Sequence, residues 1–218
     1  MAGLPSSVCC AAGGALAASI RRAAGATVCR RQQCLTAPML EIRHGDEDDT
    51  DWLLSLFDEA VAWMVARGQE AQWGSEPFSR NPRKIARVGG LVDSGGLRVA
   101  ERWGEPVAAL VVGIAPLYVP PPDHPELYIN LLISSRRHAG GGIGSALVQH
   151  AIDEALAYDA RQLRVDCWAG APTLVRWYSD QGFEPTGTFD VDGWPGQIFT
   201  MPLAVPVGAG VGSRAASD

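Results

Sequence analysis

The stretch RRHAGGGIGSALV, residues 136–148, places four glycines within five positions immediately before an apolar pattern with helical spacing. These glycines are Gly140, Gly141, Gly142 and Gly144. A residue without a Cβ atom lets the backbone approach a bound group closely and adopt left-handed angles. The start of a helix adds amides without intrahelical partners and a partial positive charge. The stretch therefore predicts a loop that holds a phosphate group with backbone N–H groups.

Two better-known phosphate loops do not fit this spacing. No Gly-Lys-Ser or Gly-Lys-Thr follows at the distance that a P-loop requires, and Ser145 or Leu147 would stand where GxGxxG has its third glycine. A turn that only connects a strand to a helix is the alternative to a phosphate site. The elements on either side of the loop therefore matter for its interpretation.

The composition of the 218 residues favours one globular domain, because 47% of them are apolar and 19% are charged. A formal charge of -6 argues against a general nucleic-acid binder, whose phosphate contacts require a basic surface. The sequence contains no apolar run of about 18 residues, so we expect no membrane-spanning helix and no membrane partner.

Four of the five cysteines lie in the first 34 residues, at spacings that match neither a disulfide framework nor a zinc site. We therefore expect no metal and a reduced, cytoplasmic protein.

Both ends differ in composition from the middle of the chain. Residues 1–38 contain four arginines and no Asp or Glu, among mostly Ala, Gly, Ser and Cys. We expect a disordered extension, or a start codon assigned too early, since Met39 opens a strand pattern; an organellar transit peptide is the alternative. Residues 204–218 carry few apolar side chains and are expected to be flexible. The folded domain is then 39–203.

Between these ends the hydrophobic periodicity alternates between strands and helices. Strands are predicted within 39–43, 96–116 (two strands joined at RWGEP), 126–135, 162–169, 183–189 and 196–203. Helices are predicted within 46–68, 82–95, 147–156 and 172–183. The last two strands are expected to form a hairpin around the loop DVDGWP at 190–195. This order predicts a mixed α/β domain.

The strand LYINLLISS, the loop AGGGIGSALV, the strand LRVDCWA and the helix LVRWYSDQGF together resemble the GNAT superfamily of N-acetyltransferases. The resemblance extends from about 39 to 203 and is strongest from 127 to 183. It implies an α/β (α+β) single domain, in which a central mixed, mostly antiparallel sheet has splayed middle strands and is flanked by helices. It also implies acetyl-CoA as the cosubstrate.

The resemblance assigns the cofactor site to the loop and to the strand before it. In the family an Arg or Gln begins the loop motif, and this chain has Ala139 there, which removes one side-chain contact and leaves the backbone cradle. Arg136 and Arg137 are candidates to supply the missing charge, with simple solvent exposure as the alternative. The backbone of the strand would pair with the pantetheine arm like a neighbouring strand. The cofactor-binding residues implied are Leu132, Ile133, Ser134, Arg137, Gly140, Gly141, Gly142, Ile143, Gly144 and Ser145.

The resemblance also assigns the chemistry. Tyr178 matches the tyrosine that protonates the departing thiolate in many members, and its alternative is a core side chain packed beside Trp177. Glu126 and Asp166 are candidates for the base that takes the proton from the amine; the alternative for each is a surface charge or an amine-positioning residue. Asn130 is predicted to share a face with Leu132 and Ser134 and to orient the substrate.

These assignments predict transfer of an acetyl group from acetyl-CoA to a primary amine by direct attack in a ternary complex. The acceptor would be a small molecule or a peptide, and a homodimer is left open. A non-catalytic acyl-CoA-binding regulator with the same fold is the first alternative. A nucleotide-binding module that uses the glycine loop for another phosphate is the second.

Overall fold

The computed structural model describes residues 8–10 and 40–204, with side chains described only in the second range. The predictions for most of 1–38 and for 205–218 therefore lie outside the described residues. Within them, one sheet has the strand order β2-β3-β4-β5-β6-β8-β7, and a short strand, β1, pairs with β5 off this path. The strands are β1 (Val8–Cys10), β2 (Leu40–His44), β3 (Leu97–Arg102), β4 (Glu105–Gly113), β5 (Glu126–Ser134), β6 (Gln162–Trp168), β7 (Glu184–Val191) and β8 (Trp194–Pro202).

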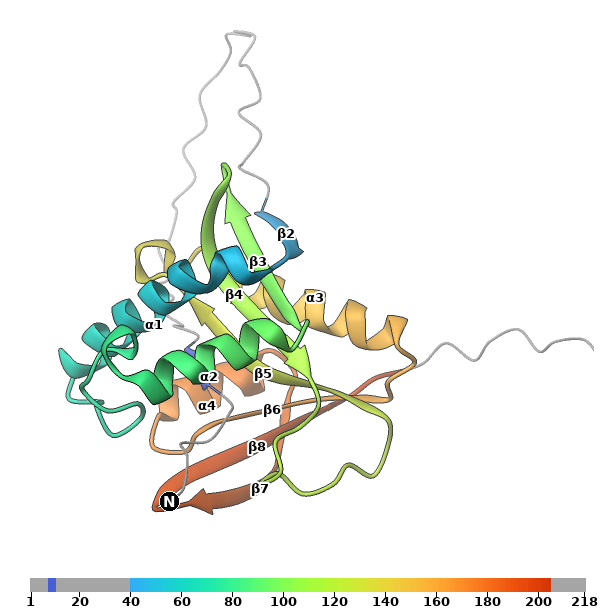
Figure 1. The fold of residues 1–218 in the computed structure, drawn as a ribbon. Coiled ribbons are helices and arrows are strands. Elements are labelled where there is room, and N and C mark those ends of the chain that lie inside the picture. The colour runs from blue at the N-terminus through green and yellow to red at the C-terminus, as the bar shows by residue number, and fades with distance from the viewer. Residues whose placement is uncertain (1–7, 11–39, 205–218) are drawn as a thin grey trace, which may run out of the picture.

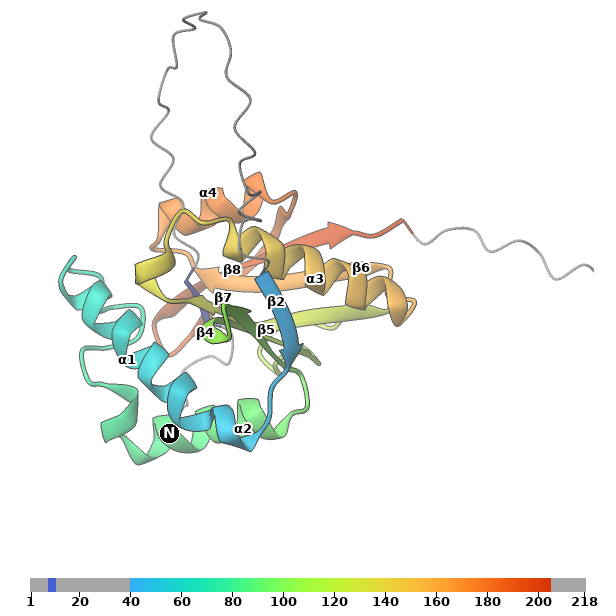
Figure 2. The same ribbon diagram turned by 90° about the horizontal axis from the view of Figure 1, so that it is seen from above.

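Among the described residues, four α-helices cover the two faces of this sheet. They are α1 (Thr50–Val65), α2 (Pro82–Asp93), α3 (Ile143–Ala157) and α4 (Pro172–Asp180). One apolar cluster joins α1 and α2 to the sheet, and a second joins α3 and α4 to the opposite face. Seen from above, the sheet lies between the two pairs of helices (Figure 2). The elements occur in the predicted order, and the predicted fold class is confirmed.

Local signals explain where these elements begin and turn. Asn81 caps α2 by accepting hydrogen bonds from two amides, and Pro82 occupies the first turn, where a missing N–H costs nothing. The hairpin between β7 and β8 turns on Asp192 and Gly193 alone, with φ angles of 52° and 81°. Such two-residue turns require left-handed angles, which Asp and Gly tolerate well. The predicted six-residue loop at 190–195 is therefore wrong, because its outer residues continue the strands.

The sheet opens in its middle, as the resemblance implied. The strands β5 and β6 run parallel and pair only over four positions, from Glu126 opposite Gln162 to Ile129 opposite Val165. Beyond them β5 continues to Ser134 without β6 as its neighbour (Figure 1). The strand β1 pairs in parallel with β5 in this opening, opposite residues 131–133. Residues 8–10 are thus a strand, whereas the sequence predicted disorder for the segment that contains them.

A bulge in β5 marks the point where the two strands separate. Val111 of β4 lies opposite Leu131, and Val112 lies opposite Ile129, so Asn130 has no partner in the ladder. The extra residue reverses the alternation of faces along β5. Asn130 therefore lies on the face of α2, while Leu132 packs toward α3. The prediction that these two residues share a face was wrong, because regular alternation does not hold across the bulge.

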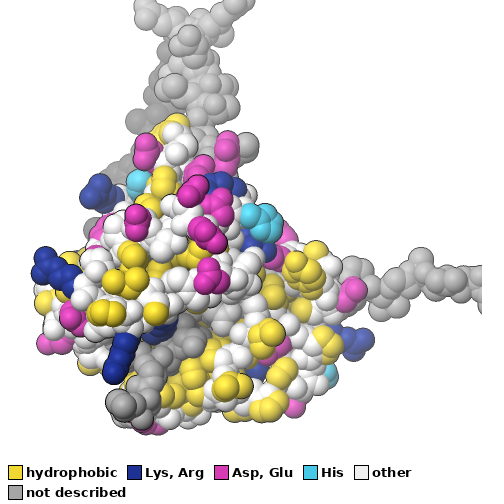
Figure 3. Space-filling view, in the orientation of Figure 1, with side chains coloured by type: hydrophobic (Ala, Val, Ile, Leu, Met, Phe, Trp, Pro, Cys, Tyr) yellow, Lys and Arg dark blue, Asp and Glu magenta, His cyan; other side chains and the backbone are white. Residues whose placement is uncertain are grey.

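The surface carries the negative charge that the composition predicts. Figure 3 shows acidic side chains on the face that α1 and α2 cover, and exposed ones near the start of α1 include Asp46, Glu47, Asp48 and Asp51. Among the described residues, none of the helices combines the length and the apolar character needed to cross a membrane. The same part of the chain contains no group of three or more His, Cys, Asp or Glu placed to hold a metal ion.

Candidate active site

The glycine loop forms a backbone cradle at the start of α3. Gly140 and Gly142 have φ angles of 78° and 73°, which explains why glycine stands at both positions. Gly142 is the N-cap of α3 and provides no side-chain cap, so the first amides of the helix keep their donors free of a capping side chain. Ile143 is buried and fixes the first turn against the core, while Gly144 and Ser145 follow it in that turn. This arrangement fits the diphosphate of acetyl-CoA.

Two side chains from distant elements hold this loop in place. Glu59 of α1 accepts hydrogen bonds from the backbone N of Arg136 at 2.8 Å and from Ser135 Oγ at 3.2 Å. Arg102, at the end of β3, donates from Nη2 to the carbonyl oxygen of Gly141 at 3.2 Å. Neither residue was found from the sequence, because a single Glu or Arg on an amphipathic element carries no local signal. Arg102 adds a positive charge beside the cradle.

The two arginines at the start of the loop have different surroundings. The guanidinium of Arg136 lies over the ring of Trp63, 4.2 Å from the ring centroid, which is a cation–π arrangement. Arg137 is exposed, and its backbone N donates to Ser135 Oγ at 3.3 Å. An exposed arginine beside a phosphate cradle can turn toward a bound anion, whereas the guanidinium of Arg136 is held over Trp63. Arg137 therefore stays the predicted phosphate contact of the two.

The backbone of β5 beyond the bulge is the second part of the cofactor site. Leu132 and Ile133 are fully buried, and Ser134 is half-buried at the end of the strand. In the structure, β1 uses this edge, with Cys9 opposite Leu132 and Cys10 opposite Ile133. The edge therefore accepts an extended, amide-bearing chain. Pantetheine carries amides of the same kind, so its predicted place fits the geometry.

Tyr178 lies on α4, is fully buried, and belongs to the core cluster to which both β5 and β6 contribute. Its ring packs against Trp177, Phe183 and Phe199, with centroid distances of 4.9, 5.6 and 5.4 Å. Within the described part of the chain, its hydroxyl has no hydrogen-bond partner. A buried hydroxyl without a partner costs about 1–3 kcal/mol. Burial also raises the pKa of Tyr178 well above its ordinary value of 10, so the group keeps its proton at neutral pH.

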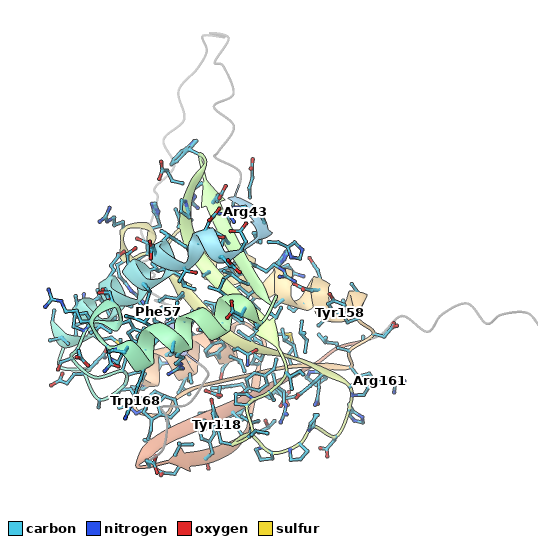
Figure 4. The ribbon with its side chains drawn as sticks, viewed as in Figure 1. Arg43, Phe57, Tyr118, Tyr158, Arg161 and Trp168 are labelled. Atoms are coloured by element: carbon cyan, nitrogen blue, oxygen red, sulfur yellow. The ribbon has the colours of Figure 1, made fainter. Side chains whose placement is uncertain are left out.

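Asp166 lies on β6 one residue past the last pair with β5 and is fully buried. Its Oδ2 accepts a hydrogen bond from the hydroxyl of Tyr128 at 2.7 Å, and the hydroxyl of Tyr118 lies 3.4 Å from the same oxygen. Tyr118, labelled in Figure 4, belongs to the segment between β4 and β5. A carboxylate is thus fixed at the point where the strands separate.

Glu126, the other candidate base, stands at the opposite end of the β5–β6 pairing. It forms an ion pair with the guanidinium of Arg164, which also donates to the carbonyl oxygen of Pro120 at 3.1 Å. The hydrogen bond that Arg164 donates to Glu126 raises the pKa of Arg164 above its usual range, which shows how strongly the two charges are coupled. The structure therefore does not bring Glu126 and Asp166 together, and Glu126 is occupied by its ion pair with Arg164.

Cys167 follows Asp166 and is the only cysteine whose side chain the described residues include. It is buried within the core cluster that α3 and α4 form with the sheet. Burial raises the pKa of its thiol far above the ordinary range, and the neighbouring Asp166 charge adds to this shift. A nucleophilic cysteine needs a thiolate, so this residue is unsuited to form an acyl-enzyme.

Comparison with known proteins agrees with this geometry. Residues 59–183, more than half of the chain, match the model of the acetyltransferase (GNAT) family. An uncharacterized N-acetyltransferase, YesJ of Bacillus subtilis, is 25% identical over 153 residues, which are 67% of this chain and 82% of that protein.

Two solved structures show the same fold. A ribosomal-protein-alanine N-acetyltransferase from Brucella melitensis is 24% identical, with a TM-score of 0.55 over 75% of this chain and 100% of that one. The yncA acetyltransferase of Salmonella typhimurium, described with its cofactor acetyl-CoA, is 17% identical, with a TM-score of 0.54 over 77% and 96%. The cradle, the opened sheet and the family match lead to one conclusion: this chain belongs to the GNAT family and is an acetyl-CoA-dependent N-acetyltransferase.

Proposed function

We propose that the protein transfers the acetyl group to a primary amine by direct attack of the amine within a ternary complex. The separation of β5 and β6 carries this proposal, because β5 leaves β6 just before the glycine loop and the uncapped start of α3, and Asp166 stands at the point of separation. The buried phenol of Tyr178 packs in a core cluster to which both strands contribute. Acetyl-CoA, when bound, supplies a thioester carbonyl for attack and a thiolate as the leaving group. The glycine loop and Arg137 would hold its diphosphate, and β5 its pantetheine.

Tyr178 would act as the general acid. The transfer forms an N–C bond and breaks a C–S bond, and the thiolate that leaves needs a proton for the reaction to balance. The hydroxyl of Tyr178 is protonated, buried and without a hydrogen-bond partner among the described residues. A departing thiolate would provide the partner that this hydroxyl lacks. The packing of the ring against three aromatic side chains would hold the donor in one orientation.

Asp166 would accept the proton that the amine loses. Amines are protonated at neutral pH and must lose a proton before or during attack. Asp166 is the carboxylate at the opening, whereas Glu126 is held by Arg164 at the far end of the paired segment. The hydrogen bond from Tyr128 fixes the orientation of the carboxylate. Asp166 is therefore our choice between the two candidates.

A thiol-release assay tests the proposal. The protein is incubated with acetyl-CoA and a panel of primary amines, while free CoA is followed by a thiol reagent and the product by mass spectrometry. We expect free CoA and an N-acetylated amine in equal amounts. Tight binding of acetyl-CoA without turnover on any amine would instead identify a non-catalytic acyl-CoA-binding regulator.

A further inference from the structure

A separate pocket of about 430 Å³ lies on the α2 face of the sheet, between α2 and the ends of β4 and β5. Its walls include Arg87, Gly90, Leu91, Val111, Gly113 and Asn130. Most of these residues are apolar or lack a side chain, and the polar groups are few. This is the usual character of a small-molecule site, and the volume falls in the usual range.

Arg87 is the charged wall of this pocket. It lies on α2 three and four residues before Gly90 and Leu91, so all three face the same side of the helix. Its Nε and Nη2 atoms are buried, and neither has a hydrogen-bond partner in the part of the chain that the structure describes. Burial lowers the pKa of Arg87 to about 10, so the guanidinium is still charged at neutral pH. The residue as a whole is half-buried, but two shielded donors without partners are suited to an anionic ligand.

The strand β5 contributes Asn130 to the wall of this pocket. Asn130 stands in the bulge where β5 leaves β6, and its Nδ2 donates to the carbonyl oxygen of Ile114 at 3.0 Å. The charge of Asp166 and the hydroxyl of Tyr118 both act electrostatically on Arg87, so these groups lie near its guanidinium. The pocket therefore holds a cation near the proposed base, and its wall includes the residue at which β5 leaves β6.

We propose that this pocket binds the acyl acceptor and that Arg87 binds a carboxylate on it, so that the substrate class is an amino acid or a comparably small amine bearing a carboxylate. This inference rests on the proposed acetyl transfer. A guanidinium offers two parallel N–H donors to a carboxylate, which fixes orientation as well as charge. The same cation would repel a polycationic acceptor such as an aminoglycoside.

Gly90 offers a test of the same assignment that does not depend on charge. A Cβ atom built at Gly90 meets nothing within 4 Å, so the helix does not need glycine there for lack of space. Glycine inside a helix also lowers helix stability relative to alanine. A small residue on the pocket wall keeps the volume open. Gly89 beside it has the same open surroundings but does not line the pocket, which makes it a matched control.

The first test compares α-amino acids with their carboxamides as acceptors, in the wild type and in Arg87→Gln. We expect wild-type kcat/KM to favour the best amino acid over its amide by at least about tenfold, and the variant to lose that preference mainly through KM for the amino acid. The amines of the two acceptors differ in intrinsic reactivity. The decisive quantity is therefore the change, from the wild type to Arg87→Gln, in the ratio of kcat/KM for the amino acid to kcat/KM for the amide. Arg87→Lys keeps the charge without the planar fork and should restore part of the preference.

Two results would overturn the inference while leaving the proposed function intact: equal use of amides and amino acids by the wild type, or the same ratio in Arg87→Gln. Turnover of no amine at all would instead defeat the proposed function. The site is then judged by calorimetry with N-acetyl amino acids, which should bind the wild type at least about tenfold more tightly than Arg87→Gln. Equal binding, or no binding to either protein, would remove Arg87 from an acceptor site.

The second test fills the pocket. Gly90→Leu should raise KM for the amino acid by at least about tenfold and leave the acetyl-CoA Kd unchanged, because the added side chain occupies the acceptor volume. Gly89→Leu makes the same chemical change one residue away and should alter neither constant. Thermal melting of both variants checks that they fold. An unchanged KM in folded Gly90→Leu, or the same increase in Gly89→Leu, would contradict the assignment.

Discussion

The proposed cofactor side and the proposed acceptor side of the opening are built from different parts of the chain. The proposed cofactor side consists mainly of backbone: the loop at 139–142, the first turn of α3 and the edge of β5. The proposed acceptor side consists of side chains from several elements, among them Arg87, Asn130 and Asp166. A backbone site recognises a group common to all acyl-CoA molecules, whereas a side-chain site selects one acceptor. The predictions below probe each side in turn.

The largest effect is expected at Asp166. Asp166→Asn keeps the size of the side chain and its hydrogen bond from Tyr128 but removes the base. We expect kcat/KM at neutral pH to fall by about 10²- to 10³-fold, within the range of general base catalysis. The deficit should shrink as pH rises, because more of the amine is then unprotonated. In the same assay, kcat/KM of Glu126→Gln should fall by less than about threefold if Asp166 is the base. The reverse order would reassign the base to Glu126.

Tyr178→Phe tests the acid. The substitution keeps the aromatic packing and removes a hydroxyl that has no hydrogen-bond partner among the described residues, so melting temperature and acetyl-CoA binding should be retained. We expect kcat to fall by about 100-fold, at the low end of acid catalysis because a thiolate already leaves easily. Wild-type turnover in the variant would return Tyr178 to a purely structural role.

The same tyrosine makes a prediction about pH. A general acid works only while it is protonated, and burial raises the pKa of Tyr178 well above 10. Tyr178 therefore stays protonated, and able to act as a general acid, at pH values where an exposed tyrosine would already have lost its proton. Wild-type kcat should show no loss assignable to this group below about pH 10. An alkaline limb near neutrality that Tyr178→Phe abolishes would show that the phenol titrates much lower than its burial allows.

The cofactor loop should respond less strongly than the chemical groups. Gly142 has a φ angle of 73°, and a Cβ built there meets no atom within 4 Å, so strain in the backbone is the reason for glycine rather than a clash. Gly142→Val should weaken acetyl-CoA binding by at least about tenfold, which equals roughly 1.4 kcal/mol, as measured by calorimetry. Gly104 has a φ angle of 78° in equally open surroundings in the turn between β3 and β4. Gly104→Val should therefore lower stability without changing the acetyl-CoA Kd. If both variants lost affinity for acetyl-CoA, the effect of Gly142→Val would not be specific to the loop.

The smallest effect concerns the N-terminal strand. The strand β1 pairs with β5 opposite 131–133, where the pantetheine arm is predicted to lie. If β1 must leave the edge before acetyl-CoA binds, the apparent Kd exceeds the intrinsic Kd, because only molecules with an uncovered edge can bind. Removal of residues 1–38 should therefore lower the acetyl-CoA Kd, that is, tighten binding, by roughly two- to fivefold. An unchanged Kd would mean that β1 does not compete with the cofactor.

The two sides of the opening also differ in how well the sequence predicted them. The cofactor loop was predictable, because glycines with left-handed angles just before a helix leave a local pattern that Gly140 and Gly142 show directly. The positions of the strands and helices followed from hydrophobic periodicity in the same way. The face of Asn130 was not predictable, since a bulge depends on the neighbouring strand and leaves no mark in β5 itself.

Arg87 shows the limit most clearly. It is the last of three basic residues in PRKIAR, on a helix with no sequence motif. It becomes informative only when folding shields two of its guanidinium nitrogens beside a pocket. Glu59 and Arg102 act across 77 and 39 positions of sequence, respectively, so no local pattern connects them to the loop. Contacts that tertiary packing creates are the part of the site that a single sequence does not reveal.

The central claim is direct transfer between two substrates bound on the two sides of the opening, and two-substrate kinetics tests it most directly. Initial rates of CoA release are measured while acetyl-CoA and the best amine are both varied. A ternary complex predicts double-reciprocal lines that intersect, with no CoA released before the amine is added. Parallel lines, together with an acetyl group found on Cys167 by mass spectrometry, would contradict the account and show a covalent acyl-enzyme.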